Sequence, residues 1–470
     1  MHPVYEKKWK IFFLVATSIF MSTLDSSIVN IALPYMMQGL KTNMQTIQWV
    51  VLMYLVTVSC LLLTFGRLSD IKGRRPVYVF GFTIFTAGSL LCGMAEIPLF
   101  LIVSRALQGC GASMLMACSP ALIVDAFPVR ERGKALGMIG AVVAAGLTTG
   151  PVVGGFILEY FSWRFIFFIN IPIGIAAALC GMLVLKDVHA AQGSGEPMDK
   201  TGGILLIIIL SSLIVFMTQL SKWGFFSALS LSFAGLFILG CIFFAVNESK
   251  SRYPLFDLKL LEIKLFVFPV IASAILFAAL FVIVFMMPFY LTYPCGFSAS
   301  KTGSIMIVPF LFLLFVSPVS GVLYDKLGSR LLCMTGMSVL TLSLVSLIYI
   351  QPSMGVLSIL WRVALAGIGT ALYVSPNNTV IMSCVPLTRR GIASGAVATA
   401  RNLGMVVGVA LAGLIFSTSF SNLTNGLSLE NYLAATEPFF MISFKRTMVM
   451  GLVLSCLGIF VTYARGKEKK

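Results

Sequence analysis

The sequence predicts an all-α integral membrane protein with fourteen transmembrane helices arranged in two related halves. Hydrophobic residues make up 59% of the 470 residues and charged residues only 11%. A soluble domain carries about a quarter charged residues, so too few are present here to cover a water-facing surface. The hydrophobic residues form runs of about 20, the length of a membrane-spanning helix. The runs do not alternate in polarity as the strands of an outer-membrane barrel would.

A charged segment that occurs twice indicates an internal duplication. Residues 66–75 lie between two apolar runs, and residues 321–330 repeat their pattern in the second part of the chain. Further positions keep nearly the same offset: Arg105 with Arg362, Gly146 with Gly404, Gly150 with Gly408 and Gly155 with Gly413. The repeat follows the tenth run rather than the eighth, so two additional spans are expected between two six-helix bundles.

The apolar runs give the expected spans in order. They cover residues 11–37, 47–66, 77–95, 99–124, 135–158, 165–185, 203–220, 227–246, 267–290, 303–323, 331–350, 357–381, 391–417 and 446–464. The chain then divides into an N-terminal six-helix bundle (1–185), a cytoplasmic linker (186–202), two inserted helices (203–246), a cytoplasmic connector (247–266), a C-terminal six-helix bundle (267–464) and a cytoplasmic tail (465–470).

The basic residues orient these spans. About four times as many Lys and Arg lie in the segments on the side of the N-terminus as in the opposite loops, and such an excess marks cytoplasmic segments. Because the number of spans is even, both termini are expected in the cytoplasm of a cell whose inner membrane holds the protein. The net charge of +16 is therefore ascribed to membrane topology, and no nucleic-acid partner is expected.

Asp25 is the carboxylate expected deepest in a span, about midway along the first run. A charge at that depth is costly and marks a functional site by default. Burial disfavours the charged form of a carboxyl group and a nearby cation favours it, so a balanced group can take up and release a proton. The alternative is a hydrogen bond that only packs one helix against another.

Arg105, in the fourth span, is the cation expected to pair with Asp25. Gln108 lies one turn further on, and Gly109 and Gly111 allow a neighbouring helix to approach closely. The alternative for Arg105 is a side chain that extends to the outer membrane surface, near which the span begins.

Two other motifs are expected to act on conformation. In the fifth span, four glycines leave a groove for a neighbouring helix and a proline permits a bend; they are Gly146, Gly150, Pro151, Gly154 and Gly155. The repeated charged segment is expected to form a gating loop at the cytoplasmic side, with Gly66, Asp70, Gly73, Arg74, Arg75, Asp325 and Arg330. General small-residue packing and plain positive-inside topology are the respective alternatives.

Polar residues inside other runs are candidates for lining a substrate cavity. They are Asn30, Gln48, Gln108, Asn377, Asn378 and Arg401. No phosphate-cradling G-x4-G-K-[ST] pattern occurs, and both histidines lie outside the expected spans. We therefore expect no cofactor, no metal site and no enzymatic activity.

These motifs resemble those of the major facilitator superfamily, in its fourteen-span drug:proton antiporter branch. Residues 66–75 resemble the superfamily signature between spans 2 and 3, and residues 24–34 resemble the first-span motif of the antiporters. Residues 146–155 resemble the fifth-span antiporter motif, and residues 163–174 resemble a segment typical of the fourteen-span branch. Their order and spacing extend the resemblance over nearly the whole chain.

The resemblance implies a proton-coupled efflux antiporter for drugs or other amphiphiles that works by alternating access. It links Arg105 to proton translocation, the fifth-span glycines to export, and Asp70 with its arginines to a latch between the cytoplasmic faces. The expected partners are a small amphipathic substrate, protons and the lipid bilayer, with the protein as a monomer. Exporters of a specific metabolite or lipid, an importer, and a transport-inactive sensor remain alternatives.

Overall fold

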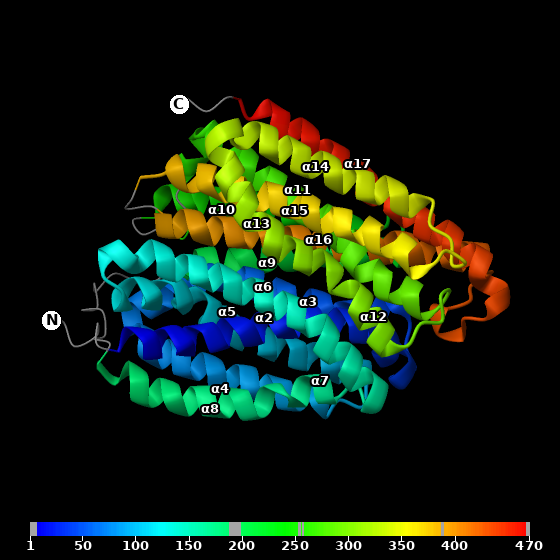
Figure 1. The fold of residues 1–470 in the computed structure, drawn as a ribbon, viewed down its shortest axis with the longest axis horizontal. Helices are drawn as coiled ribbons and strands as arrows, with labels where there is room; N and C mark the ends of the chain where they lie inside the picture. The colour runs from blue at the N-terminus through cyan, green and yellow to red at the C-terminus, as the bar shows by residue number, and fades with distance from the viewer. Residues whose placement is uncertain (1–6, 188–198, 252–254, 256–257, 387–389, 467–470) are drawn as a thin grey trace.

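The structure is a computed structural model that describes residues 7–187, 199–251, 255, 258–386 and 390–466. It contains fourteen helices, two of them interrupted, that are long and apolar enough to cross a membrane. Figure 1 shows them as one elongated helical bundle, with the start of the first helix and the end of the last at the same end. We call this the terminal end and the other the distal end. The predicted all-α class and span number are confirmed.

The N-terminal half contains six spans in order. They are α2 (Lys8–Gly39), α3 (Met44–Lys72), α4 (Arg74–Gly93), α5 (Pro98–Ala126), α6 (Val129–Tyr160) and the interrupted pair α7 (Phe165–Phe168) and α8 (Asn170–Val184). The first, second and fifth helices extend beyond the predicted runs because their charged ends remain helical. Within this half α2 packs against α6, α4 against α5, and α3 against α5.

The C-terminal half repeats this packing with six further spans. They are α11 (Lys264–Thr292), the pair α12 (Ala299–Met306) and α13 (Val308–Leu327), α14 (Ser329–Ile348), α15 (Val356–Ser383), α16 (Arg390–Leu423) and α17 (Glu437–Ala464). Here α11 packs against α16, α14 against α15, and α13 against α15, as in the first half. The predicted start of the last span at residue 446 was wrong, since α17 begins nine residues earlier at Glu437.

Two additional helices, α9 (Lys200–Trp223) and α10 (Ala228–Lys250), separate the halves in the sequence. α9 packs against α3 of one half and α16 of the other, whereas α10 packs mainly against α9. Most of the expected linker, part of the connector and the last tail residues (188–198, 252–254, 256–257 and 467–470) lie outside the described residues.

The halves contact each other at the distal end. Gln38 of α2 donates a hydrogen bond to the Tyr293 hydroxyl (3.3 Å), and the Ser300 backbone amide donates to Glu159 (3.1 Å). Burial raises the pKa of Tyr293 to about 12, so this hydroxyl stays neutral at physiological pH. The distal closure therefore does not depend on ionisation of that tyrosine.

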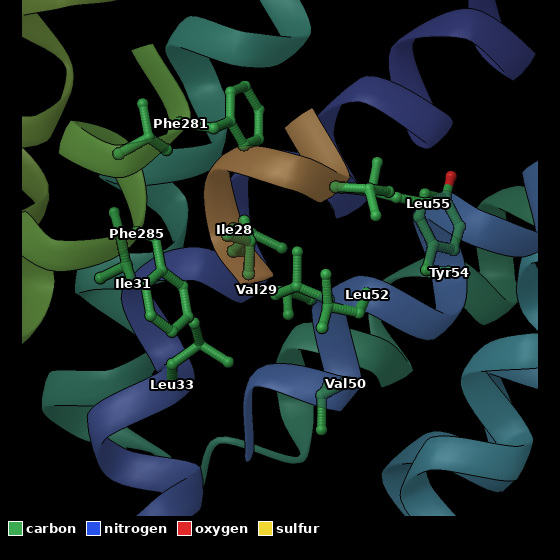
Figure 2. Close-up of a cluster of buried hydrophobic side chains, with 14 of the residues drawn as sticks. Ile28, Val29, Ile31, Leu33, Val50, Leu52, Tyr54, Leu55, Phe281 and Phe285 are labelled. Atoms are coloured by element: carbon green, nitrogen blue, oxygen red, sulfur yellow. The ribbon is translucent and has the colours of Figure 1, made fainter. Parts of the chain in front are cut away.

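An apolar layer lies inside this closure. Figure 2 shows Phe281 and Phe285 of α11 beside Ile28 and Ile31 of α2, and all four are buried. Because α11 belongs to one half and α2 to the other, this layer closes the centre of the bundle between the two halves.

The terminal end is less tightly closed. A Cβ added at Gly133, Gly137 or Gly140, in the part of α6 near that end, would meet no atom within 4 Å. One contact between the halves persists there, because a Cβ added at Gly395 of α16 would lie 2.7 Å from Leu63 of α3. The arrangement is closed distally and loosely packed along α6 toward the terminal end.

Candidate functional site

A fully buried ion pair joins α2 and α5. The side chains of Asp25 and Arg105 are 0% and 1% exposed, and Arg105 Nη1 lies 2.6 Å from Asp25 Oδ2. Arg105 Nε donates to the Val50 carbonyl of α3 (3.0 Å), and its guanidinium lies 4.2 Å from the centre of the Tyr54 ring. Arg105 thus turns into the bundle, so the alternative that it extends to the membrane surface was wrong.

Two amides complete the coordination of the carboxylate. Gln108 Nε2 donates to Asp25 Oδ1 at 2.8 Å, and Asn170 Nδ2 of α8 donates to the same oxygen at 3.2 Å. Gln108 Nε2 also donates to Ser89 Oγ of α4 at 2.8 Å, and Arg105 donates to Gln108 Oε1 at 2.5 Å. Residues of α5 and α8 thus bind the carboxylate on α2 directly, and α3 and α4 hold Arg105 and Gln108 in turn; we call these contacts the Asp25 network.

The sequence predicted Asp25, Arg105 and Gln108 as site residues but not Asn170, Ser89 or Tyr54. Gln108 was expected in a cavity, whereas it is fully buried in this network. Asn170 begins α8. It is a lone amide in an apolar segment, and this was the one feature of the sequence that could have marked it as a site residue. Only the packing of α8 against α2 and α4 brings that amide to the carboxylate.

The fifth-span glycines hold α6 against α2 beside this network. A Cβ added at Gly146 would clash with Thr23, one at Gly150 with Ser27, and one at Gly154 would lie 2.6 Å from Ile28. These residues flank Asp25 on α2. The predicted groove for a neighbouring helix is therefore present over these three glycines.

Gly155 differs from the other three. Its added Cβ would lie 2.7 Å from the Ala299 carbonyl of α12, in the other half. Opposite it, a Cβ added at Gly303 would clash with the Pro151 carbonyl. The prediction that all four glycines share one side was wrong, because adjacent positions on a helix point about 100° apart. Gly155 and Pro151 instead take part in the distal closure.

We expect Gly150→Ala to lower both the thermal unfolding temperature and the transport rate, because the new methyl group would overlap Ser27 Oγ and approach its Cβ to 2.9 Å. Overpacking of this kind typically costs about 1–3 kcal/mol. Gly137→Ala on the same helix is the matched control, since its methyl group enters open space. Equal unfolding temperatures for the two variants would contradict this account of α6 packing.

The repeated charged segment is not an extended loop. α3 continues through Gly66 and Asp70 to Lys72, and a single residue, Gly73 (φ 90°), separates it from α4. Gly328 (φ 76°) separates α13 from α14 in the same way. Only glycine adopts such a backbone readily. The prediction of a loop from Gly66 to Arg75 was therefore wrong, although both breaks fall at the expected glycines.

The charges of this segment bind within the N-terminal half. Arg74 forms an ion pair with Asp125 at the end of α5 and lies 3.7 Å from the half-exposed Asp70. Arg75 donates to the Met182 carbonyl of α8 at 2.9 Å. These described contacts do not bridge the halves. Asp125 was missed from the sequence because it stands at the edge of an apolar run.

In the copy within the C-terminal half, the described residues form no such ion pairs. Arg330 donates to the Tyr463 carbonyl of α17 at 2.8 Å and lies over the ring of the same tyrosine. Asp325 is exposed. The two halves therefore share the pattern of charged residues but not the contacts that these residues make.

Most of the predicted cavity residues are buried in helix contacts instead. Asn30 donates to Ser26 of its own helix, and Asn377 donates to the Pro269 carbonyl of α11 (3.2 Å). Gln48 is buried where α3 meets α16. Asn378 of α15 is exposed, whereas Arg401 of α16 is partly exposed. Arg401 is the one charged residue of the six, and no ion pair to it is found among the described residues.

The C-terminal half has no counterpart of the acid. Ala274 and Ala278 of α11 meet Gly404 and Gly408, as Thr23 and Ser27 of α2 meet Gly146 and Gly150. In this register Leu276, which is buried, takes the place of Asp25. Arg362, the counterpart of Arg105, donates to the Ser358 and Ser346 carbonyls instead of a carboxylate. Among the described residues, no group of three or more His, Cys, Asp or Glu could hold a metal ion.

Comparison with known proteins agrees with this architecture. The profile of the Major Facilitator Superfamily matches residues 15–409. The chain belongs to the major facilitator superfamily. Its fourteen candidate spans fit the fourteen-span branch, and as a member of this superfamily it is a transporter rather than an enzyme.

Similar proteins include transporters of different substrates. The riboflavin transporter RibZ of Clostridioides difficile is 35% identical over 88% of this chain and 90% of that protein. The multidrug resistance protein Stp of Mycobacterium tuberculosis is 30% identical over 90% of this chain and 78% of that protein. The tetracenomycin C resistance and export protein of Streptomyces glaucescens is 29% identical over 88% and 76%.

Solved structures share the fold. A bacterial homologue of the human lysosomal transporter Spinster, in an inward-facing and unoccupied conformation, has a TM-score of 0.70 at 14% identity over 98% of this chain and 97% of that one. An autoinhibited peptide transporter of the POT family has a TM-score of 0.72 at 14% identity, with 98% of each chain covered. At this identity the likeness concerns the fold alone.

Proposed function

We propose that this major facilitator is a proton-coupled antiporter that exports small amphipathic compounds by alternating access. The observation that carries the proposal is the buried Asp25–Arg105 pair, since ionisable groups within spans are costly and mark proton relays and ion pathways. Relatives named for multidrug resistance and for export support the substrate class and the direction.

The Asp25 network suits a proton cycle. When Asp25 takes up a proton, Arg105 loses its counter-charge but keeps the Val50 carbonyl, the Gln108 oxygen and the Tyr54 ring. These contacts would still hold the cation in place when the carboxylate is neutral. Substrate that binds more tightly to one protonation state shifts the population of conformations, which is what coupling requires.

The charged segment that ends α3 and begins α4 is proposed to gate the terminal end. In this distally closed state Arg74 is held by Asp125 of its own half. Release of that pair would free Arg74 to bind elsewhere when the terminal end closes. Because both partners are near water, the pair is worth about 1 kcal/mol or less, which suits a contact that must break in each cycle.

We expect Arg74→Gln to slow transport several-fold while hardly changing the unfolding temperature, because the pair is partly exposed and weakly stabilising. Asp125→Asn, which leaves Arg74 free to bind elsewhere, should slow transport no more than Arg74→Gln, and the double variant should be no slower than Arg74→Gln. Transport rates in membrane vesicles and thermal unfolding of the purified protein check this. Additive losses of rate would show that the two residues do not act as a pair.

A second candidate substrate is a flavin. The 35% identical relative is named a riboflavin transporter, and the abundant Phe and Met residues, 38 and 24 in number, would suit a planar aromatic compound. In this alternative the protein is a transporter of one metabolite rather than of varied drugs.

We further propose that the terminal end faces the cytoplasm of an inner-membrane protein, with both termini inside, because basic residues concentrate there. The working unit is proposed to be a monomer, since the Asp25 network is complete within one chain. Its partners are the substrate, protons and lipid, without nucleic acid.

Proteoliposomes with an imposed pH gradient test the proposal. Ethidium, riboflavin and a neutral amphiphile would be added in turn while lumenal pH is recorded. Antiport predicts proton movement opposite to that of the compound. Movement in the same direction would favour an importer, and a response to riboflavin alone would favour the flavin candidate. No proton movement with any of the three compounds would favour a transport-inactive sensor.

A further inference from the structure

Arg401 of α16 is the one intramembrane arginine whose charge the described residues leave without a hydrogen bond or an ion pair. Its Nε is buried without a hydrogen-bond partner, and its guanidinium lies 5.9 Å from the centre of the Phe277 ring of α11. Arg105 and Arg362, by contrast, have two or more oxygen partners each. Because the side chain is only partly buried, its charge stays accessible to a ligand, and charged groups within spans commonly mark substrate pathways.

Helix geometry places Arg401 between the two halves. Seven residues make about two turns, so Arg401 shares a face with Gly408, which contacts the Ala278 carbonyl of α11. Asn402, about 100° further round, shares a face with Gly395 and Gly413, which contact α3. Arg401 therefore lies on the side of α16 directed toward the seam between α11 and α3, one helix from each half.

Arg401 has the aromatic ring of Phe277 on its α11 side, and the next residue of α16, Asn402, carries an amide toward α3. Phe277 precedes Phe281 and Phe285 of the closed apolar layer by one and two turns of α11, on the side of the terminal end. Asn402 is buried, and its Nδ2 donor has no partner. An aromatic surface, a cation and a free amide donor together match a ligand that is aromatic and carries an anionic group.

From these observations we propose that Arg401 binds the anionic group of an aromatic substrate beneath the apolar layer, with Phe277 against the ring system. This assignment rests on the proposed transport function and narrows its substrate class to aromatic anions and zwitterions. It also divides the tasks between the halves, because the N-terminal half carries the acid for the proton and the C-terminal half carries the cation for the substrate.

Two dyes that share the N-phenyl-1-naphthylamine skeleton test this assignment. 1-Anilinonaphthalene-8-sulfonate carries a sulfonate, and N-phenyl-1-naphthylamine lacks it. Their binding to the full-length protein in nanodiscs would be measured by fluorescence, with empty nanodiscs subtracted. The wild type is expected to bind the sulfonate dye more tightly. Arg401→Gln should weaken that binding about tenfold, a change of about 1.4 kcal/mol, without changing the affinity for the neutral dye.

Arg401→Lys should restore part of the affinity because it keeps the charge. Arg446→Gln, which removes an arginine already held by Ser419, is the matched control and should leave both affinities unchanged. Equal affinity of the wild type for the two dyes, or equal loss of both in Arg401→Gln, would overturn the assignment. The dye-binding experiment uses no proton gradient, so a failure of proton coupling in proteoliposomes would not affect its result. A failure of the dye-binding prediction would likewise leave the proton-coupling proposal intact.

Discussion

Asp25→Asn is expected to abolish substrate-induced proton movement while the protein still folds and binds its substrate. Asparagine has nearly the shape of aspartate, and its side-chain oxygen can still accept from Arg105, Gln108 or Asn170. It carries no proton that can be released at physiological pH. The proton flux that the substrate induces in proteoliposomes should therefore fall to the level of protein-free liposomes.

Glu96→Gln, in the exposed turn between α4 and α5, is the control for loss of a carboxylate as such and should retain full flux. Substrate binding by the same samples shows that the Asp25→Asn protein is intact. Undiminished substrate-induced flux in Asp25→Asn would remove this residue from the coupling step and leave it the role of a packing contact.

Arg105→Met should cause the largest loss of stability among the substitutions considered. It leaves the Asp25 carboxylate buried with only the Gln108 and Asn170 amides. Removal of one partner from a buried ion pair typically costs about 3–5 kcal/mol, because the other charge stays uncompensated. The thermal unfolding temperature in nanodiscs should therefore fall by several degrees.

The double variant Asp25→Asn/Arg105→Met separates this cause from simple loss of packing. Replacement of both charges removes the uncompensated carboxylate, so the double variant should recover most of the lost stability while remaining inactive. A double variant as unstable as Arg105→Met alone would show that the guanidinium acts by filling space and not by its charge.

The number and order of the spans followed from the sequence because the requirement to cross a bilayer leaves a strong signal in runs of apolar residues. The ends of the spans were harder to predict than their number. The start of α17 was missed because Lys445 and Arg446 seemed to mark a loop, whereas the Arg446 side chain is accommodated by Ser419 of α16. The segment after Gly66 was misjudged because charged residues can continue a helix beyond the apolar part.

The pairing of Asp25 with Arg105 could be predicted because buried charges need partners and few are available in the membrane. Asn170 and Ser89 could not, since isolated polar residues in apolar runs are common and only tertiary packing selects those that meet the carboxylate. Asn30 and Asn377 show the converse: their position within a span suggested a cavity, but each donates to a carbonyl oxygen of a helix.

Proton release by the purified protein tests the central claim most directly. The full-length protein in a weakly buffered detergent solution with a pH indicator would receive whichever of ethidium, riboflavin, 1-anilinonaphthalene-8-sulfonate and the neutral amphiphile binds it. Wild type and Asp25→Asn would be compared over a range of pH. The proposed mechanism predicts substrate-induced release of protons from the wild type and none from Asp25→Asn. Equal release from both proteins would contradict the assignment of Asp25 as the proton-carrying group.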